Sequence, residues 1–74
     1  MKSIPSVEIN HVVYREKSLV HFPDNTFGTI LALTNQDVTI CLNGENTPDI
    51  IPMAVFLDEV QERQLLDRAE QKLS

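Results

Sequence analysis

The segment "FGTILALTNQDVTICLNG", residues 27–44, has the pattern of two strands joined by a tight turn. Every second residue from Val38 to Leu42 is aliphatic, which is typical of a strand with one buried face. The preceding "TILALT" is apolar on both faces, as in a central strand. The "NQD" between them consists of turn-forming residues. The sequence therefore predicts an antiparallel hairpin of strands 29–34 and 38–43.

Two further strands are predicted upstream of this hairpin. The stretch "VEINHVVY", residues 7–14, alternates as a single strand. The stretch "SLVHF", residues 18–22, is short and apolar, and Pro23 ends it because proline has no backbone donor. One face of the first strand is predicted to carry Val7, Ile9, His11 and Val13.

Downstream of the hairpin, the composition predicts a loop and then a helix. Residues 44–52 contain Gly44 and two prolines, which favour irregular structure. Within them, "DIIP", residues 49–52, is a candidate for a brief extended stretch that packs Ile50 and Ile51. Pro52 suits the first turn of a helix, and Asp49 is a candidate cap for that turn. No glycine or proline follows, so a helix is predicted over residues 53–73.

The order of these elements predicts the fold class. Strands followed by a helix indicate an α+β protein, here a small antiparallel sheet or SH3-like partial barrel of about four strands followed by one C-terminal helix. The 74 residues form a single domain, 1–74. The domain divides into a strand-rich part 6–43, a loop 44–52 and a helix 53–73.

The predicted helix carries apolar residues on two opposite sides. At about 100° per residue, Met53, Phe56, Leu57 and Val60 share one side. A second apolar stripe lies about 120–220° around the axis from Met53. We call it the tail stripe, and it consists of Leu65, Leu66, Ala69 and Leu73.

Three interpretations of this mismatch compete. The helix breaks near residues 61–64 and both halves cover the same core, although no glycine or proline is present there. Alternatively, the helix stays straight and its second half projects toward another molecule. In the third interpretation, the tail is frayed and its leucines are incidental. The pairs Glu59–Arg63 and Arg63–Asp67, each four residues apart, favour a continuous helix.

Size and charge limit the functional classes. A chain this short obtains only about 3–5 kcal/mol from its own core, so partners often stabilise such domains. Cys41 is the only cysteine, and the polar N-terminus does not resemble a signal peptide, so a cytoplasmic location is expected. No apolar run is long enough to span a bilayer.

The net charge is −5, which disfavours nucleic acid and suits a basic partner. Candidate contacts for that partner are Glu45, Asp49, Asp58, Glu59 and Glu62.

Catalytic and metal-binding chemistry has little support in the sequence. His11, His21 and Cys41 are the candidate nucleophile, base or soft ligands, and they lie on three different predicted strands. None forms the closely spaced pairs that are typical of zinc sites, even with Asp24 as a fourth ligand. No glycine-rich phosphate loop occurs. No catalytic residue, cofactor or metal is therefore predicted.

The sequence favours a small non-enzymatic interaction or regulatory protein, an inhibitor or accessory subunit of bacterial or phage type. A homodimer through the tail stripe is expected, and the same stripe could instead recognise a different protein. The alternative is a small β-barrel module that binds nucleic acid. Its aromatic platform would be Tyr14, Phe22 and Phe27, with Arg15 and Lys17 beside it.

Overall fold

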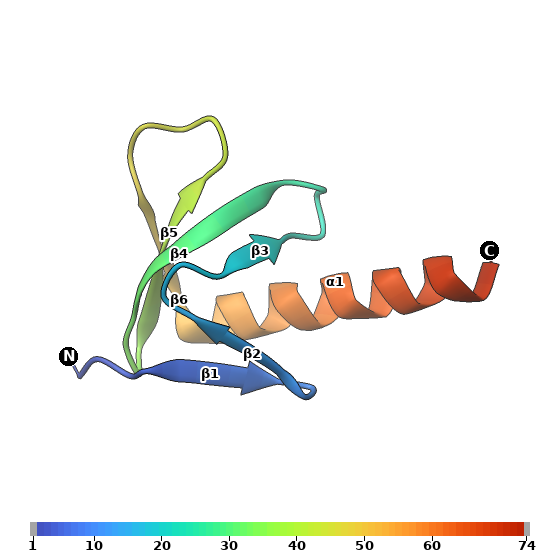
Figure 1. Ribbon diagram of the computed structural model, residues 1–74, viewed down its shortest axis with the longest axis horizontal. Coiled ribbons are helices and arrows are strands. Elements are labelled where there is room, and N and C mark those ends of the chain that lie inside the picture. Colours follow the sequence, from blue (N-terminus) through green and yellow to red (C-terminus); the bar gives the residue numbers. More distant parts are fainter. Residues whose placement is uncertain (1, 74) are drawn as a thin grey trace.

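The computed structural model describes residues 2–73, and side chains as far as residue 71. The chain forms six antiparallel strands in two sheets and one C-terminal helix (Figure 1). The predicted α+β class is therefore confirmed, with six strands in place of about four. The elements are β1 (Ser6–Ile9), β2 (Val12–Arg15), β3 (Leu19–His21), β4 (Phe27–Leu33), β5 (Asp37–Leu42), β6 (Asp49–Pro52) and α1 (Met53–Leu73).

The predicted central hairpin is confirmed as β4 and β5, which pair around Ile30 and Ile40. The register shifts at Leu31, so this strand bulges and bends. The tight turn is held by Thr34, whose hydroxyl accepts hydrogen bonds from the backbone amides of Gln36 and Asp37 at 3.1 and 2.9 Å. β3 and β6 flank this hairpin in a four-stranded sheet of order β3-β4-β5-β6.

The prediction of one strand over residues 7–14 is wrong, because the chain reverses at Asn10 and His11. Both residues have positive φ, at 51° and 71°, the left-handed conformation that a two-residue hairpin turn requires. The two short arms are β1 and β2. The turn places Val12 opposite Ile9, so Val13 does not share the face of Ile9 as predicted.

Within the predicted loop 44–52, the candidate extended stretch is a strand, because residues 49–52 pair with β5 as β6. Pro52 is tolerated there because β6 is at the edge of the sheet. Asp49 lies within this strand, opposite Ile40, so it does not cap α1 as predicted. The amide of Met53 donates instead to the carbonyl of Gln36, at 2.8 Å.

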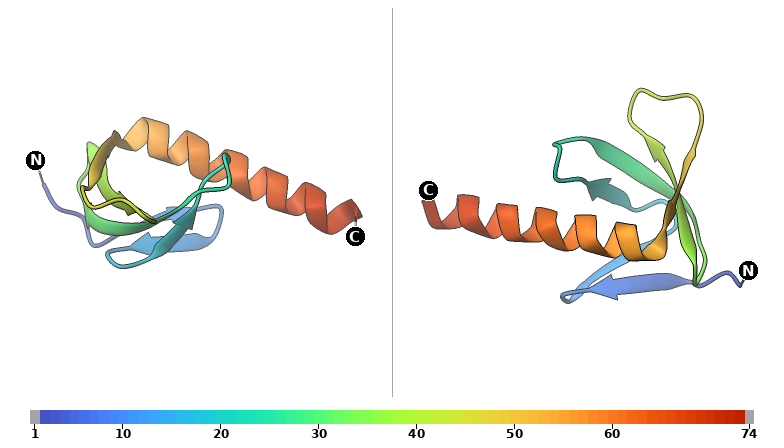
Figure 2. Two further views of the ribbon diagram at one scale, coloured as in Figure 1. Left: turned by 90° about the horizontal axis from the view of Figure 1, so that it is seen from above. Right: turned by 180° about the vertical axis from the view of Figure 1, so that it is seen from behind.

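The core lies between the four-stranded sheet, the β1–β2 hairpin and the first half of α1 (Figure 2). Phe56 and Val60 of the helix are 0% and 1% exposed. The segments on either side of the β1–β2 hairpin bond to β4 through backbone hydrogen bonds, such as Ile4 N to Leu33 O at 3.1 Å and Lys17 N to Ile30 O at 2.7 Å. The buried apolar residues are Ile9, Val20, Phe22, Ile30, Leu33, Val38, Ile40, Phe56 and Val60.

Helix α1 is continuous, which excludes the interpretation in which it breaks near residues 61–64. Arg63 is 8% exposed, and its guanidinium donates to Oδ1 of Asp67 at 2.7 and 3.0 Å. Gln64 donates to the carbonyl of Ile9 at 3.2 Å and to the hydroxyl of Tyr14 at 3.3 Å. Beyond Gln64 the helix extends past both sheets for about 14 Å at 1.5 Å per residue (Figure 1).

Candidate interaction surfaces

The three residues considered for catalysis are on different elements. His11 is exposed in the turn between β1 and β2. His21, on β3, hydrogen-bonds Asn25 Oδ1 at 2.7 Å. Cys41 is half-buried on β5, and its thiol contacts the carbonyl oxygens of Leu42 and Glu45. Within residues 2–71, no group of three or more His, Cys, Asp or Glu side chains is placed to hold a metal ion.

The aromatic residues considered for a nucleic-acid platform do not share a surface. Phe22 is buried, at 4% exposed. Tyr14 packs edge-on against Phe56, with ring centroids 6.1 Å apart and planes at 89°. Phe27 is exposed and stacks on His21, with centroids 4.2 Å apart. A platform of the three rings is therefore contradicted by the fold, because two of them serve the core.

The tail stripe lies outside the core. Leu65 and Leu66 are 64% and 40% exposed, and Ala69 is also exposed. The helix is straight, so the side that faces the sheets in its first half continues as Asp67 in its second half. The stripe thus points away from the core. The side chain of Leu73, the fourth predicted member, lies outside the described residues.

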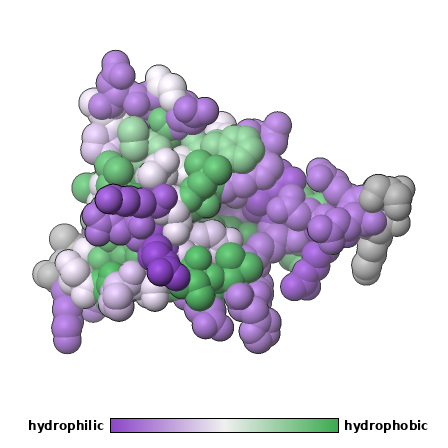
Figure 3. Space-filling view, in the orientation of Figure 1, coloured by the Kyte–Doolittle hydropathy of each residue, from purple (hydrophilic) through white to green (hydrophobic). Residues whose placement is uncertain are grey.

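The face of the four-stranded sheet opposite α1 also exposes large apolar side chains, which the sequence pattern did not predict to face solvent. Strand alternation places Leu19, Phe27 and Ile50 on this face, and the bulge adds Leu31. Their exposed fractions are 65%, 39%, 69% and 42%, respectively. We call these four residues the outer sheet face. Figure 3 shows apolar residues gathered over the sheets and polar residues over the protruding helix.

The structure separates the acidic residues that were predicted to form one contact surface. Glu45 lies in the β5–β6 connection, which rises away from α1, and Asp49 begins β6 (Figure 1). Asp58 is exposed on the helix. Glu59 and Glu62 lie together at a pocket. The five residues therefore do not form one acidic surface: Glu59 and Glu62 lie together at the pocket, and the other three carboxylates are separate from them.

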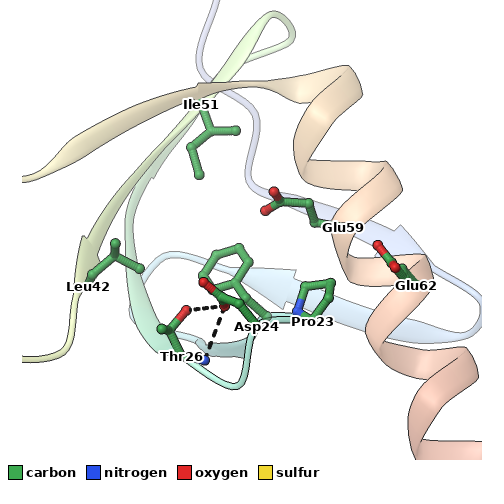
Figure 4. A pocket seen from close by; sticks show the side chains of 8 residues that line it. Pro23, Asp24, Thr26, Leu42, Ile51, Glu59 and Glu62 are labelled. Atoms are coloured by element: carbon green, nitrogen blue, oxygen red, sulfur yellow. Dashed lines mark hydrogen bonds between the residues drawn. The ribbon is translucent and has the colours of Figure 1, made fainter.

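This pocket lies between the β3–β4 turn, the sheet and α1, with a volume of about 330 Å³ (Figure 4). Glu59 and Glu62 reach toward it from the helix, opposite Leu42 and Ile51 of the sheet. The turn from β3 to β4 closes the third side. The residues from that turn were not predicted, because turn formers carry no signal of a distant helix. The complete lining is Phe22, Pro23, Asp24, Thr26, Leu42, Ile51, Glu59 and Glu62.

Asp24 at the pocket is held in one orientation by the turn. Its Oδ1 accepts hydrogen bonds from the Thr26 hydroxyl at 2.6 Å and from the Thr26 amide at 3.2 Å. These two hydrogen bonds lower the pKa of the Asp24 carboxyl because they favour its charged form, and the bond from the Thr26 hydroxyl has the larger effect. The carboxylate is therefore ionised at neutral pH, and Oδ2 forms none of the hydrogen bonds seen within residues 2–71.

Among residues 2–73, no helix is long and apolar enough to cross a membrane. Comparison with protein-family models, with curated proteins and with solved structures finds no match to this chain. Functional inference therefore rests on the tail stripe, the outer sheet face and the pocket.

Proposed function

We propose that this chain is a cytoplasmic, non-enzymatic protein-interaction protein, a regulator or accessory subunit, that works as a homodimer through the tail stripe. The observation that carries the proposal is the straight helix, which leaves Leu65, Leu66 and Ala69 exposed beyond the last core contact at Gln64. Two such helices placed side by side would shelter both stripes.

Energetics support pairing of this kind. Full burial of a leucine side chain contributes about 1.5–3 kcal/mol. A domain of this size gains only about 3–5 kcal/mol from its own core. Burying Leu65 and Leu66 against a partner would therefore contribute as much stability as a large part of the core does. The tail also consists mainly of good helix formers, so the stripe is already ordered before contact.

Two observations support the non-enzymatic and cytoplasmic parts of the proposal. The residues capable of nucleophilic or general-base chemistry, His11, His21 and Cys41, make no hydrogen bond to one another. Cys41 is the sole cysteine of the chain, so no intrachain disulfide can form, as is usual for proteins of reducing compartments.

The experiment compares two double variants that match in chemistry and in exposure. Leu65→Gln/Leu66→Gln removes the tail stripe at positions 64% and 40% exposed. Leu19→Gln/Leu31→Gln removes leucines of the outer sheet face that are 65% and 42% exposed. Neither pair changes the net charge, and glutamine is close to leucine in helix propensity. Sedimentation velocity is run on wild type and both variants over a hundredfold range of concentration.

We expect wild type and the sheet variant to sediment as dimers, and the tail variant as a monomer. A wild type that stays monomeric throughout the range would overturn the homodimer. The homodimer through the tail stripe would also be overturned if only the sheet variant were monomeric, because the interface would then lie on the outer sheet face. Circular dichroism of each variant verifies that the fold is retained.

A further inference from the structure

The pocket between the β3–β4 turn and α1 has a largely apolar interior. Phe22, Pro23, Leu42 and Ile51 contribute apolar surface to its lining. Its volume of about 330 Å³ is at the small end of the range of about 300–1,000 Å³ for small-molecule sites. Such a cavity accepts one long side chain and is too small for a folded segment of a partner.

Three carboxylates complete the lining of this pocket: Asp24 from the turn, and Glu59 and Glu62 from α1 (Figure 4). Within residues 2–71, the ion pairs are those of Arg63 with other carboxylates on the tail of the helix. The carboxylates of the pocket therefore form no ion pair in the described part of the chain. Like charges three residues apart on a helix repel, so a bound cation would relieve this repulsion.

We propose that this pocket binds the side chain of an arginine residue presented by a partner protein. The inference rests on the proposed function, because it specifies the chemistry of that partner. The aliphatic stem of the arginine packs between Leu42 and Ile51, as such stems do along apolar surface. The guanidinium reaches Glu59 and Glu62 and forms charge-assisted hydrogen bonds.

The arrangement of the carboxylates favours arginine over lysine. Glu59 and Glu62 approach from the helix, whereas Asp24 approaches from the turn on another side. A guanidinium has five N–H donors in a flat fork, and it can face several carboxylates at once. An ammonium is compact and more strongly hydrated, so it loses more on leaving water for an apolar pocket.

The test uses the full-length, ¹⁵N-labelled protein and two blocked amino acids. N-acetyl-arginine amide is titrated into the protein while amide chemical shifts are recorded. N-acetyl-citrulline amide has nearly the same shape without the charge, and it is the matched ligand. We expect arginine to shift the amides of Thr26, Leu42, Ile51 and Glu59, with a dissociation constant on the order of millimolar. We expect the citrulline amide to bind at least about tenfold more weakly than the arginine amide.

A pair of protein variants separates the pocket from the general acidity of the chain. Glu59→Gln/Glu62→Gln removes the two helix carboxylates of the pocket. Glu45→Gln/Asp58→Asn removes the same total charge at exposed positions that do not line the pocket. The pocket variant should bind the arginine amide about tenfold more weakly, and the distant variant should bind it as wild type does.

Equal weakening by both variants, or equal binding of citrulline, would overturn the proposal. The amide spectra of the variants show whether each one is folded, so lost binding is not confused with lost structure. Glu62 lines the pocket one helical turn before Leu65 and Leu66, so arginine binding and self-association are measured separately, by amide shifts and by sedimentation. Sedimentation of the pocket variant should still give a dimer. A wild-type protein that binds arginine but stays monomeric would refute only the homodimer.

Discussion

Gly28 on β4 occupies a position where the core leaves no room for a side chain. A Cβ atom there would lie 2.6 Å from Cγ2 of Ile40 and 3.3 Å from atoms of Leu42 and Phe22. Gly28→Ala should therefore destabilise the protein by about 1–3 kcal/mol, because strand pairing holds the neighbouring backbone in place. Urea unfolding followed by circular dichroism measures the change.

Ala32 provides a control in the same strand. Its side chain is exposed, so Ala32→Val adds two methyl groups on the opposite face without overlap. Its free energy of unfolding should stay within about 0.5 kcal/mol of wild type. A Gly28→Ala protein that is as stable as Ala32→Val would show that β4 and β5 can move apart at little cost.

At the scale of elements, Gln64 joins helix α1 to the β1–β2 hairpin. Its amide bridges the carbonyl of Ile9, the hydroxyl of Tyr14 and the side chain of Asn10. Gln64→Ala should lower the free energy of unfolding by about 1–2 kcal/mol, since these groups lose their partner. Amide hydrogen exchange should accelerate most in the hairpin, because it is tied to the larger sheet by few backbone bonds. Gln61→Ala, at an exposed position of the same helix, should change neither quantity.

Local patterns were sufficient to predict the central hairpin and the helix, and insufficient for the elements around them. The alternation from Val38 to Leu42 and the absence of breakers after Pro52 are signals carried by neighbouring residues. The turn at Asn10 and His11 lacks the glycine that normally marks a two-residue hairpin, so nothing local distinguished it from a continuous strand. For β6 the sequence indicated a brief extended stretch within a loop and not its pairing with β5, because Pro52 is tolerated only in an edge strand.

The candidate site shows the same division. The tail stripe follows from helical periodicity alone, and its leucines were predicted before their exposure was known. The pocket could not be predicted, because it brings together a turn at Asp24, two sheet residues and helix residues more than thirty positions away. The outer sheet face was missed because "TILALT", apolar on both sides, predicts a strand covered on both faces.

On the scale of the whole molecule, the tail stripe and the outer sheet face lie on opposite sides of the core. The outer sheet face is on one side of the four-stranded sheet, and α1 covers the other side and continues beyond it (Figure 2). Binding at the tail stripe therefore leaves the outer sheet face accessible. A homodimer of this kind would present two copies of that face.

If folding and dimerisation through the tail stripe are one process, stability must depend on concentration. A hundredfold rise in protein concentration raises the free energy of unfolding by about 2.7 kcal/mol per dimer. With the unfolding entropy typical of two chains of this length, Tm should rise on the order of 5–10 °C. Differential scanning calorimetry at the two concentrations measures the shift, and Leu65→Gln/Leu66→Gln is the comparison. That variant should have a Tm that is lower and independent of concentration, because its chains unfold singly. A wild type whose Tm is equally independent of concentration would mean that the leucines of the tail do not hold two chains together.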